Sequence, residues 1–133
     1  MKEILTVEVS LDKVYEVNSP EGSACMILFH GESDCENFKG TVLPGGVDTQ
    51  KQPTGGVRSL SARYILEGTD YTGEPCHIFI ENNGTITPDG QMKTKPVIYT
   101  DSKALSWMMS ADISGTVTIA GEAAVHISLC IPD

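Results

Sequence analysis

The chain has 133 residues, of which 40% are hydrophobic and 20% charged, a composition typical of one globular domain. Its formal net charge is −9 at pH 7, so the clustered positive charge that a nucleic-acid or anionic-membrane partner requires is missing. We therefore expect a single domain over residues 1–133 and neither of those partners.

The N-terminal stretch, residues 1–17, carries acidic residues inside its apolar run and lacks the uninterrupted apolar core of an export signal. No other run approaches the roughly 18 apolar residues of a membrane-spanning helix. Without an export signal, reduced thiols are favoured over disulfides for the four widely spaced cysteines. They are Cys25, Cys35, Cys76 and Cys130. The sequence thus predicts a cytoplasmic protein with free thiols.

Alternation of apolar and polar residues dominates the first part of the chain. Residues 5–11 place leucine and valine on one face and polar residues on the other, as in a half-buried strand. Residues 23–31 are almost continuously apolar, which predicts a strand buried on both faces. A shorter strand over residues 38–43 is stopped by Pro44, and residues 51–56 are predicted to form a loop.

The clearest element is a hairpin over residues 57–83, in which the polar turn TDYTG joins two alternating strands. If the turn centres near Thr72, one side of the hairpin carries three facing pairs. They are Arg63 with Glu81, Ile65 with Phe79, and Glu67 with His77. The other side is apolar, with Ala62, Tyr64, Leu66, Cys76, Ile78 and Ile80. Either this apolar side lines the core, or Arg63, Glu81 and His77 point into a partly polar lumen.

The rest of the chain predicts more strands and one helical turn. The strands are residues 95–100, 114–121 and 123–131, and the turn is residues 101–109, capped by Asp101 or Ser102. With about eight strands in total, the fold class is all-β, either an antiparallel barrel or a two-sheet sandwich. A barrel of this size is either filled by side chains or just wide enough for one small ligand.

No motif for metal, nucleotide or covalent catalysis is present. The three histidines lie on separate runs without a second ligand at zinc-site spacing, and no glycine pair is followed by a phosphate-binding lysine. The sequence therefore predicts no metal and no cofactor. The only tryptophan, Trp107, either packs in the core or forms an apolar floor for a ligand together with Met108 and Met109.

Several stretches, in their order, resemble the small bacterial and fungal proteins of the family DUF3237. They are FKGTVLPGGVD, SARYILEGTD, IFIENNG, a proline followed by an aromatic strand, a turn with tryptophan, and a final strand pair. The resemblance spans nearly the whole chain and implies a lipocalin-like antiparallel barrel in a family without a settled activity. It singles out Asp48, Arg63 and Trp107. Family members often have tryptophan where this chain has Thr49, and Leu-Asn where it has Met108-Met109, so any pocket lacks an aromatic and an amide.

Two classes of function follow. In the first, the barrel binds a small organic molecule, such as a carboxylate-bearing one, as a binding protein or a cofactor-free isomerase, cyclase or lyase. Arg63 would hold a carboxylate or enolate oxygen, and Glu81 or Asp48 would transfer a proton. In the second, the interior is filled and the barrel is a non-catalytic interaction protein that pairs with another subunit, for example as a homo-oligomer.

We favour the ligand-binding class, although the residues leave open whether a reaction is catalysed. Asp48 itself has two interpretations, because it either caps the turn made by the Gly-Gly pair before it or reaches a ligand at the mouth of the barrel. The expected ligand-binding residues are Asp48, Arg63, Glu81 and Trp107.

Overall fold

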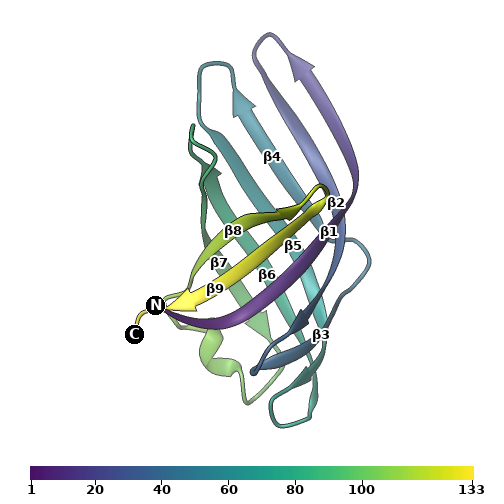
Figure 1. Cartoon of the computed structure of the whole chain (residues 1–133), viewed down its shortest axis with the longest axis vertical. Coiled ribbons are helices and arrows are strands. Elements are labelled where there is room, and N and C mark those ends of the chain that lie inside the picture. Colours follow the sequence, from purple (N-terminus) through teal and green to yellow (C-terminus); the bar gives the residue numbers. More distant parts are fainter.

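Nine antiparallel strands and one short 3-10 helix make up the chain in a computed structural model that describes residues 1–133 (Figure 1). The strands are β1 (Lys2–Ser19), β2 (Gly22–Asp34), β3 (Phe38–Val42), β4 (Val47–Pro53), β5 (Arg58–Asp70), β6 (Pro75–Ile86), β7 (Met92–Thr100), β8 (Ser114–Gly121) and β9 (Ala124–Ile131). The helix η1 (Ser106–Met109) lies between β7 and β8. The predicted all-β class is confirmed, with one strand more than the expected eight.

The strands close into a barrel. Pairing runs in the order β1, β9, β8, β7, β6 and β5, after which β3 and β4 both lie between β5 and β2. Strand β2 then pairs with β1 and closes the sheet. Because β3 and β4 share one position, nine strands fill eight positions around the barrel. The two-sheet alternative is therefore excluded, and the interior has the width that suits one small ligand.

A kink over residues 43–46 separates β3 from β4 within their shared position. At its start, the N–H of Leu43 donates a hydrogen bond to the carbonyl of Ile65. At its end, the carbonyl of Gly46 accepts a hydrogen bond from the N–H of Phe29. A Cβ on Gly46 would lie 3.1 Å from both the ring and the carbonyl oxygen of Phe29, so the close approach favours glycine here. The Pro-Gly-Gly break is thus a bend inside a barrel strand, and Asp48 follows it in β4 with its side chain toward the lumen.

Strand β4 corrects one prediction. Residues 51–53, expected to be loop, continue this strand and pair with β2, and Lys51 also pairs with β5. Its inward positions are occupied by Asp48 and Gln50. Since those positions carry polar residues, the apolar alternation that reveals a strand is absent from the sequence of β4.

Strand β2 corrects another prediction, because it is not buried on both faces. Cys25 and Phe29 are buried, but Met26 is 48% exposed. The upper half of the β1–β2 hairpin projects beyond the rim of the barrel (Figure 1), where Val14 and Val17 are also exposed. The continuous apolar run therefore belongs to a strand with a buried inner face and an exposed outer face, because Met26 lies on the outer side between β1 and β4.

The β5–β6 hairpin has the predicted register: Arg63 pairs with Glu81, Ile65 with Phe79, and Glu67 with His77. The six apolar residues of the opposite side are all buried in the core. This apolar side therefore lines the interior of the barrel, which confirms the first of the two interpretations of the hairpin. The alternative in which Arg63, Glu81 and His77 point into the lumen is wrong for this hairpin.

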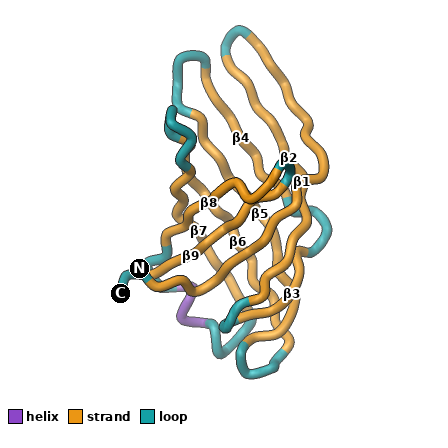
Figure 2. Tube along the Cα trace, viewed as in Figure 1, coloured by secondary structure: helices purple, strands orange, loops and turns teal.

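The two ends of the barrel differ (Figure 2). At one end, η1 and the turn before it place Leu105 and Met108 in the hydrophobic core, to which Phe38 also belongs, so this end is plugged by apolar side chains. The hydroxyl of Ser102 accepts a hydrogen bond from the N–H of Leu105 at 3.1 Å and donates one to Asp70 at 2.7 Å. A helical turn therefore forms within the predicted residues 101–109, but it begins at Ser106 without a side-chain cap, and Ser102 instead stabilises the turn before it. The opposite end carries the β1–β2, β4–β5, β6–β7 and β8–β9 turns.

The four cysteines are unpaired, as predicted, and Cys25 and Cys76 are buried. No helix of the structure is long and apolar enough to cross a membrane.

Gly68→Ala should strongly destabilise the barrel. Gly68 pairs with Gly40 across β3 and β5, and a Cβ on Gly68 would lie 2.0 Å from the carbonyl oxygen of Lys39. Because the obstructing atoms are backbone, we expect the free energy of unfolding in urea to fall by about 2 kcal/mol or more. Gly121→Ala is the control, since its new Cβ meets nothing closer than 3.5 Å. Equal effects of the two substitutions would contradict the close approach of β3 and β5.

Candidate functional site

A cavity of about 230 Å³ occupies the lumen toward the end of the barrel opposite η1. Its lining comes from eight of the nine strands and from the β8–β9 turn, and 12 of its 17 residues are hydrophobic. The polar side chains among them are Asp48, Gln50, Asn82 and Glu122. A concave, mainly apolar space with a few polar groups is the usual form of a small-molecule site.

Asp48 is held at the wall of this cavity by Gln50. The amide Nε2 of Gln50 donates to Oδ2 of Asp48 at 2.8 Å, and its Oε1 accepts from Nε of Arg58 at 2.7 Å. Arg58 also donates to Sγ of Cys25 at 3.2 Å. Gln50 therefore separates the carboxylate from the nearest guanidinium. Burial raises the pKa of Asp48, and the hydrogen bond from Gln50 opposes the shift.

The other oxygen of this carboxylate, Oδ1, has no hydrogen-bond partner in the protein. The same holds for both side-chain polar atoms of Asn82, the hydroxyl of Thr94 and the hydroxyl of Tyr64, all of them buried. Burial also raises the pKa of Tyr64. Buried polar atoms in folded proteins are nearly always hydrogen-bonded, so several free ones within one lumen point to a partner that is not part of the chain.

The structure separates the residues that the sequence singled out. Asp48 lines the cavity, whereas Arg63 and Glu81 face each other on the outer side of the barrel, along a separate shallow groove. No ion pair joins these two, and Glu81 instead accepts a hydrogen bond from Asn83 at 3.0 Å. Trp107 is 37% exposed on η1, at the plugged end, and so is neither a core residue nor a cavity floor.

Two polar residues of the cavity lining, Gln50 and Asn82, were not predicted from the sequence. The same is true of Arg58, which donates to Gln50, and of Thr94, which lies next to Asn82. Asn82 left a readable signal, because it continues the inward series of Ile78 and Ile80 in β6 with a polar side chain. Thr94 left none, because it lies just before the strand that the sequence predicted over residues 95–100.

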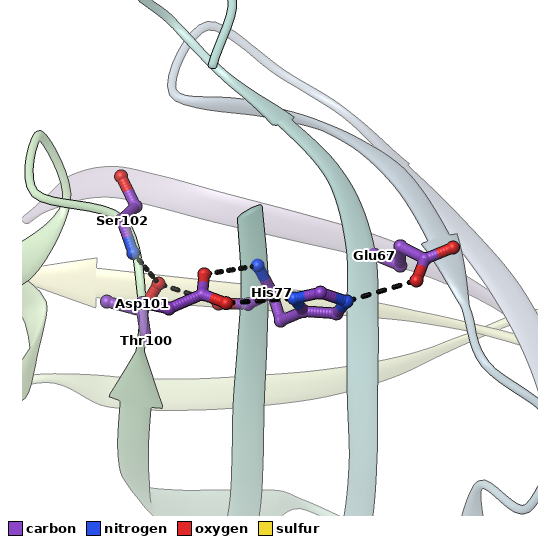
Figure 3. Close-up of polar contacts among 5 residues, drawn as sticks. All are labelled: Glu67, His77, Thr100, Asp101 and Ser102. Atoms are coloured by element: carbon purple, nitrogen blue, oxygen red, sulfur yellow. Dashed lines mark hydrogen bonds and ion pairs between the residues drawn. The ribbon is translucent and has the colours of Figure 1, made fainter. Parts of the chain in front are cut away.

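A second cluster of titratable groups lies on the outer face of the barrel (Figure 3). His77 Nδ1 lies 2.9 Å from Oδ2 of Asp101, and its Nε2 lies 3.0 Å from Oε2 of Glu67. The backbone N–H of His77 donates to Asp101 Oδ1 at 2.6 Å, and the hydroxyl of Thr100 donates to the His77 carbonyl. These contacts join β5, β6 and the end of β7. Because the cluster is exposed and lies outside the cavity, we assign it a structural role.

Comparison with known proteins identifies the family. The chain matches the family described as protein of unknown function (DUF3237) over residues 1–97. The chain belongs to this family. The UPF0311 protein of Clostridium acetobutylicum is 30% identical over 129 residues, which cover 82% of this chain and 79% of that protein. The predicted resemblance is thereby confirmed.

Solved structures share the fold of this chain. A protein of unknown function from Clostridium acetobutylicum has a TM-score of 0.81 at 27% identity, covering 96% of this chain and 95% of the other. A β-barrel-like protein from Acinetobacter baumannii has a TM-score of 0.74 at 19% identity, covering 96% and 92%. The second likeness concerns the fold alone.

Replacing Asp48 should stabilise this DUF3237 barrel at neutral pH. Because burial raises the folded-state pKa above the ordinary value of 3.8, the ionised carboxylate costs stability, and the cost develops as pH rises from 3.8 through the folded-state pKa. We expect Asp48→Asn to melt at a higher temperature than wild type at pH 7, with the advantage disappearing in acid. Asp34→Asn, at an exposed aspartate, is the control. A variant less stable than wild type at pH 7 would contradict the unfavourable burial.

His77 should titrate above its ordinary pKa of 6.5, because hydrogen bonds to Asp101 and then Glu67 favour its charged form. Its contribution to stability is then complete below pH 6.5 and is lost as pH rises through the folded-state pKa. NMR titration of the imidazole resonances measures this pKa directly. Asp101→Asn should lower it more than Glu67→Gln does. A wild-type value at or below 6.5 would show that the contacts of Figure 3 are not formed in solution.

Proposed function

We propose that the lumen binds a small, mainly apolar organic molecule whose polar end contacts Asp48 and Asn82. The observation that carries this proposal is an apolar cavity whose buried polar atoms lack partners within the chain. An unsatisfied buried polar group costs about 1–3 kcal/mol, and a bound molecule that hydrogen-bonds to it offsets this cost. The cavity also favours binding over the alternative in which the interior is filled.

The charges around the cavity narrow the class of molecule. Its lining includes two acidic residues, Asp48 and Glu122, and no lysine or arginine. Arg58 is engaged with Gln50 and Cys25, and Arg63 lies on the outer side. The carboxylate of a ligand would face the acidic side chain of Asp48, with no lysine or arginine in the lining to pair with it. We therefore infer a neutral ligand with hydrogen-bond donors rather than the carboxylate that an inward Arg63 would have favoured.

Proton transfer to or from the bound molecule is a second candidate function. Asp48 combines a raised pKa with one free carboxylate oxygen in the cavity, which are the properties of a general acid or base. Under this proposal, Asp48→Asn would retain ligand binding but lose turnover of the bound molecule.

We also infer that the protein acts in the cytoplasm. The four unpaired cysteines support this inference, because free thiols persist in a reducing compartment.

Blocking the mouth of the cavity tests the binding function. Ala124 lines the cavity and the adjacent Ala123 is exposed outside it, so Ala124→Trp and Ala123→Trp form a matched pair. We expect the neutral dye N-phenylnaphthylamine to fluoresce on binding to wild type and Ala123→Trp but not to Ala124→Trp. If a molecule co-purifies, native mass spectrometry should detect it bound to wild type and to Ala123→Trp but not to Ala124→Trp.

Arg63→Ala provides a further control. Since Arg63 lies on the outer side of the barrel, this substitution should leave dye binding unchanged. Dye binding that survives in Ala124→Trp, or its absence from wild type together with a ligand-free native mass, would rule out the lumen as the binding site.

A further inference from the structure

Five inward residues form one layer across neighbouring strands of the lumen. Asp48 of β4 pairs with Ala62 of β5, which pairs with Asn82 of β6. Thr94 of β7 lies diagonally next to Asn82, and it pairs with Gly115 of β8. We call this layer the polar girdle. Three of its members are polar and two are small, and its members Asp48, Ala62 and Asn82 line the cavity.

The polar members of the girdle have unused hydrogen-bonding capacity. Asn82 is 1% exposed and Thr94 is 3% exposed, and no protein atom bonds the Asn82 amide or the Thr94 hydroxyl. Asp48 keeps one free oxygen, Oδ1. Because these groups do not bond one another, stabilising the empty barrel does not explain their presence.

The small members of the girdle leave room next to these atoms. The missing side chain of Gly115 is replaced by its neighbours, since a Cβ there would lie 2.3 Å from Oγ1 of Thr94, 2.9 Å from Cδ2 of Leu129 and 3.5 Å from Oδ1 of Asn82. Glycine thus lets the Thr94 hydroxyl lie over β8, near the Asn82 amide. On the other side of Asn82, only the methyl group of Ala62 separates it from Asp48. Strands β4 and β6 are two strand spacings apart, roughly 10 Å, which leaves space for a planar head group between the two side chains.

We propose that the girdle binds the polar head of the ligand and that this head is a primary carboxamide, with the apolar part directed toward the mouth. The inference rests on the proposed function of the lumen. The free Asn82 amide offers an N–H donor beside a carbonyl acceptor, which matches a second amide. The remaining N–H of a primary carboxamide donates to Oδ1 of Asp48. A carboxylate head would supply only acceptors and would face Asp48 with a like charge.

Three small aromatic probes test this assignment on the wild-type protein. Benzamide carries the carboxamide, benzoate carries the anion, and ethylbenzene carries no polar group. We expect benzamide to displace N-phenylnaphthylamine at a concentration about tenfold or more below that needed for either of the others. Binding of the dye itself tests the lumen independently of any head group.

Two variants locate the recognition. Asn82→Leu should still bind the dye but lose the preference for benzamide over ethylbenzene. Thr94→Val, which keeps the shape of the side chain, should reduce this preference. Asn83→Leu is the control and should preserve the preference for benzamide. Asn83 is adjacent in sequence and forms hydrogen bonds with Ser61 and Glu81.

The outcomes separate the two proposals. Dye binding without a benzamide preference in wild type, or a preference that persists in both Asn82→Leu and Thr94→Val, would overturn the carboxamide assignment and leave the proposed function intact. Failure of the dye and all three probes to bind would overturn both. If Asn82→Leu does not fold, the selectivity of wild type and of Thr94→Val tests the carboxamide assignment.

Discussion

The pairing of β1 with β2 closes the sheet, and the properties of the lumen depend on that closure. In a closed antiparallel barrel every strand has one face inside, so successive residues are assigned to the interior or the exterior without exception. Polar residues at inward positions are then removed from bulk water by the barrel itself. Arg63 and Asp48 illustrate the consequence. They lie on neighbouring paired strands, yet one faces outward and the other faces the cavity.

The kink over residues 43–46 shows how a local backbone feature sets this assignment. It lets β3 and β4 occupy one position in the barrel with different registers against β2 and β5. Proline interrupts the ladder and Gly46 permits the approach to Phe29, so the chain re-enters the sheet at Val47. Asp48 is thus neither a simple turn cap nor a free rim residue. Gln50 holds it in the wall of the cavity.

The sequence predicted what local patterns determine. The β5–β6 register followed from one short polar turn, and the barrel followed from repeated alternation and from the family resemblance. It did not reveal β4, whose inward residues are polar, or the exposure of Met26, whose side chain lies on the outer face of the barrel. The girdle was not predicted because Thr94 lies outside the strand expected over residues 95–100, and because β4, which carries Asp48, was not recognised as a strand beyond residue 50.

The position of the polar atoms, more than their number, argues for a ligand. Scattered unsatisfied groups would weaken a barrel without any common purpose, and apolar residues of similar size would stabilise it at the same positions. Here three polar side chains occupy one layer, with Ala62 between Asp48 and Asn82, and two of them line an apolar cavity. The plugged end, by contrast, satisfies its buried Ser102 and Asp70 through hydrogen bonds. The same chain therefore satisfies its polar groups where it needs rigidity and leaves them free where a molecule can bind.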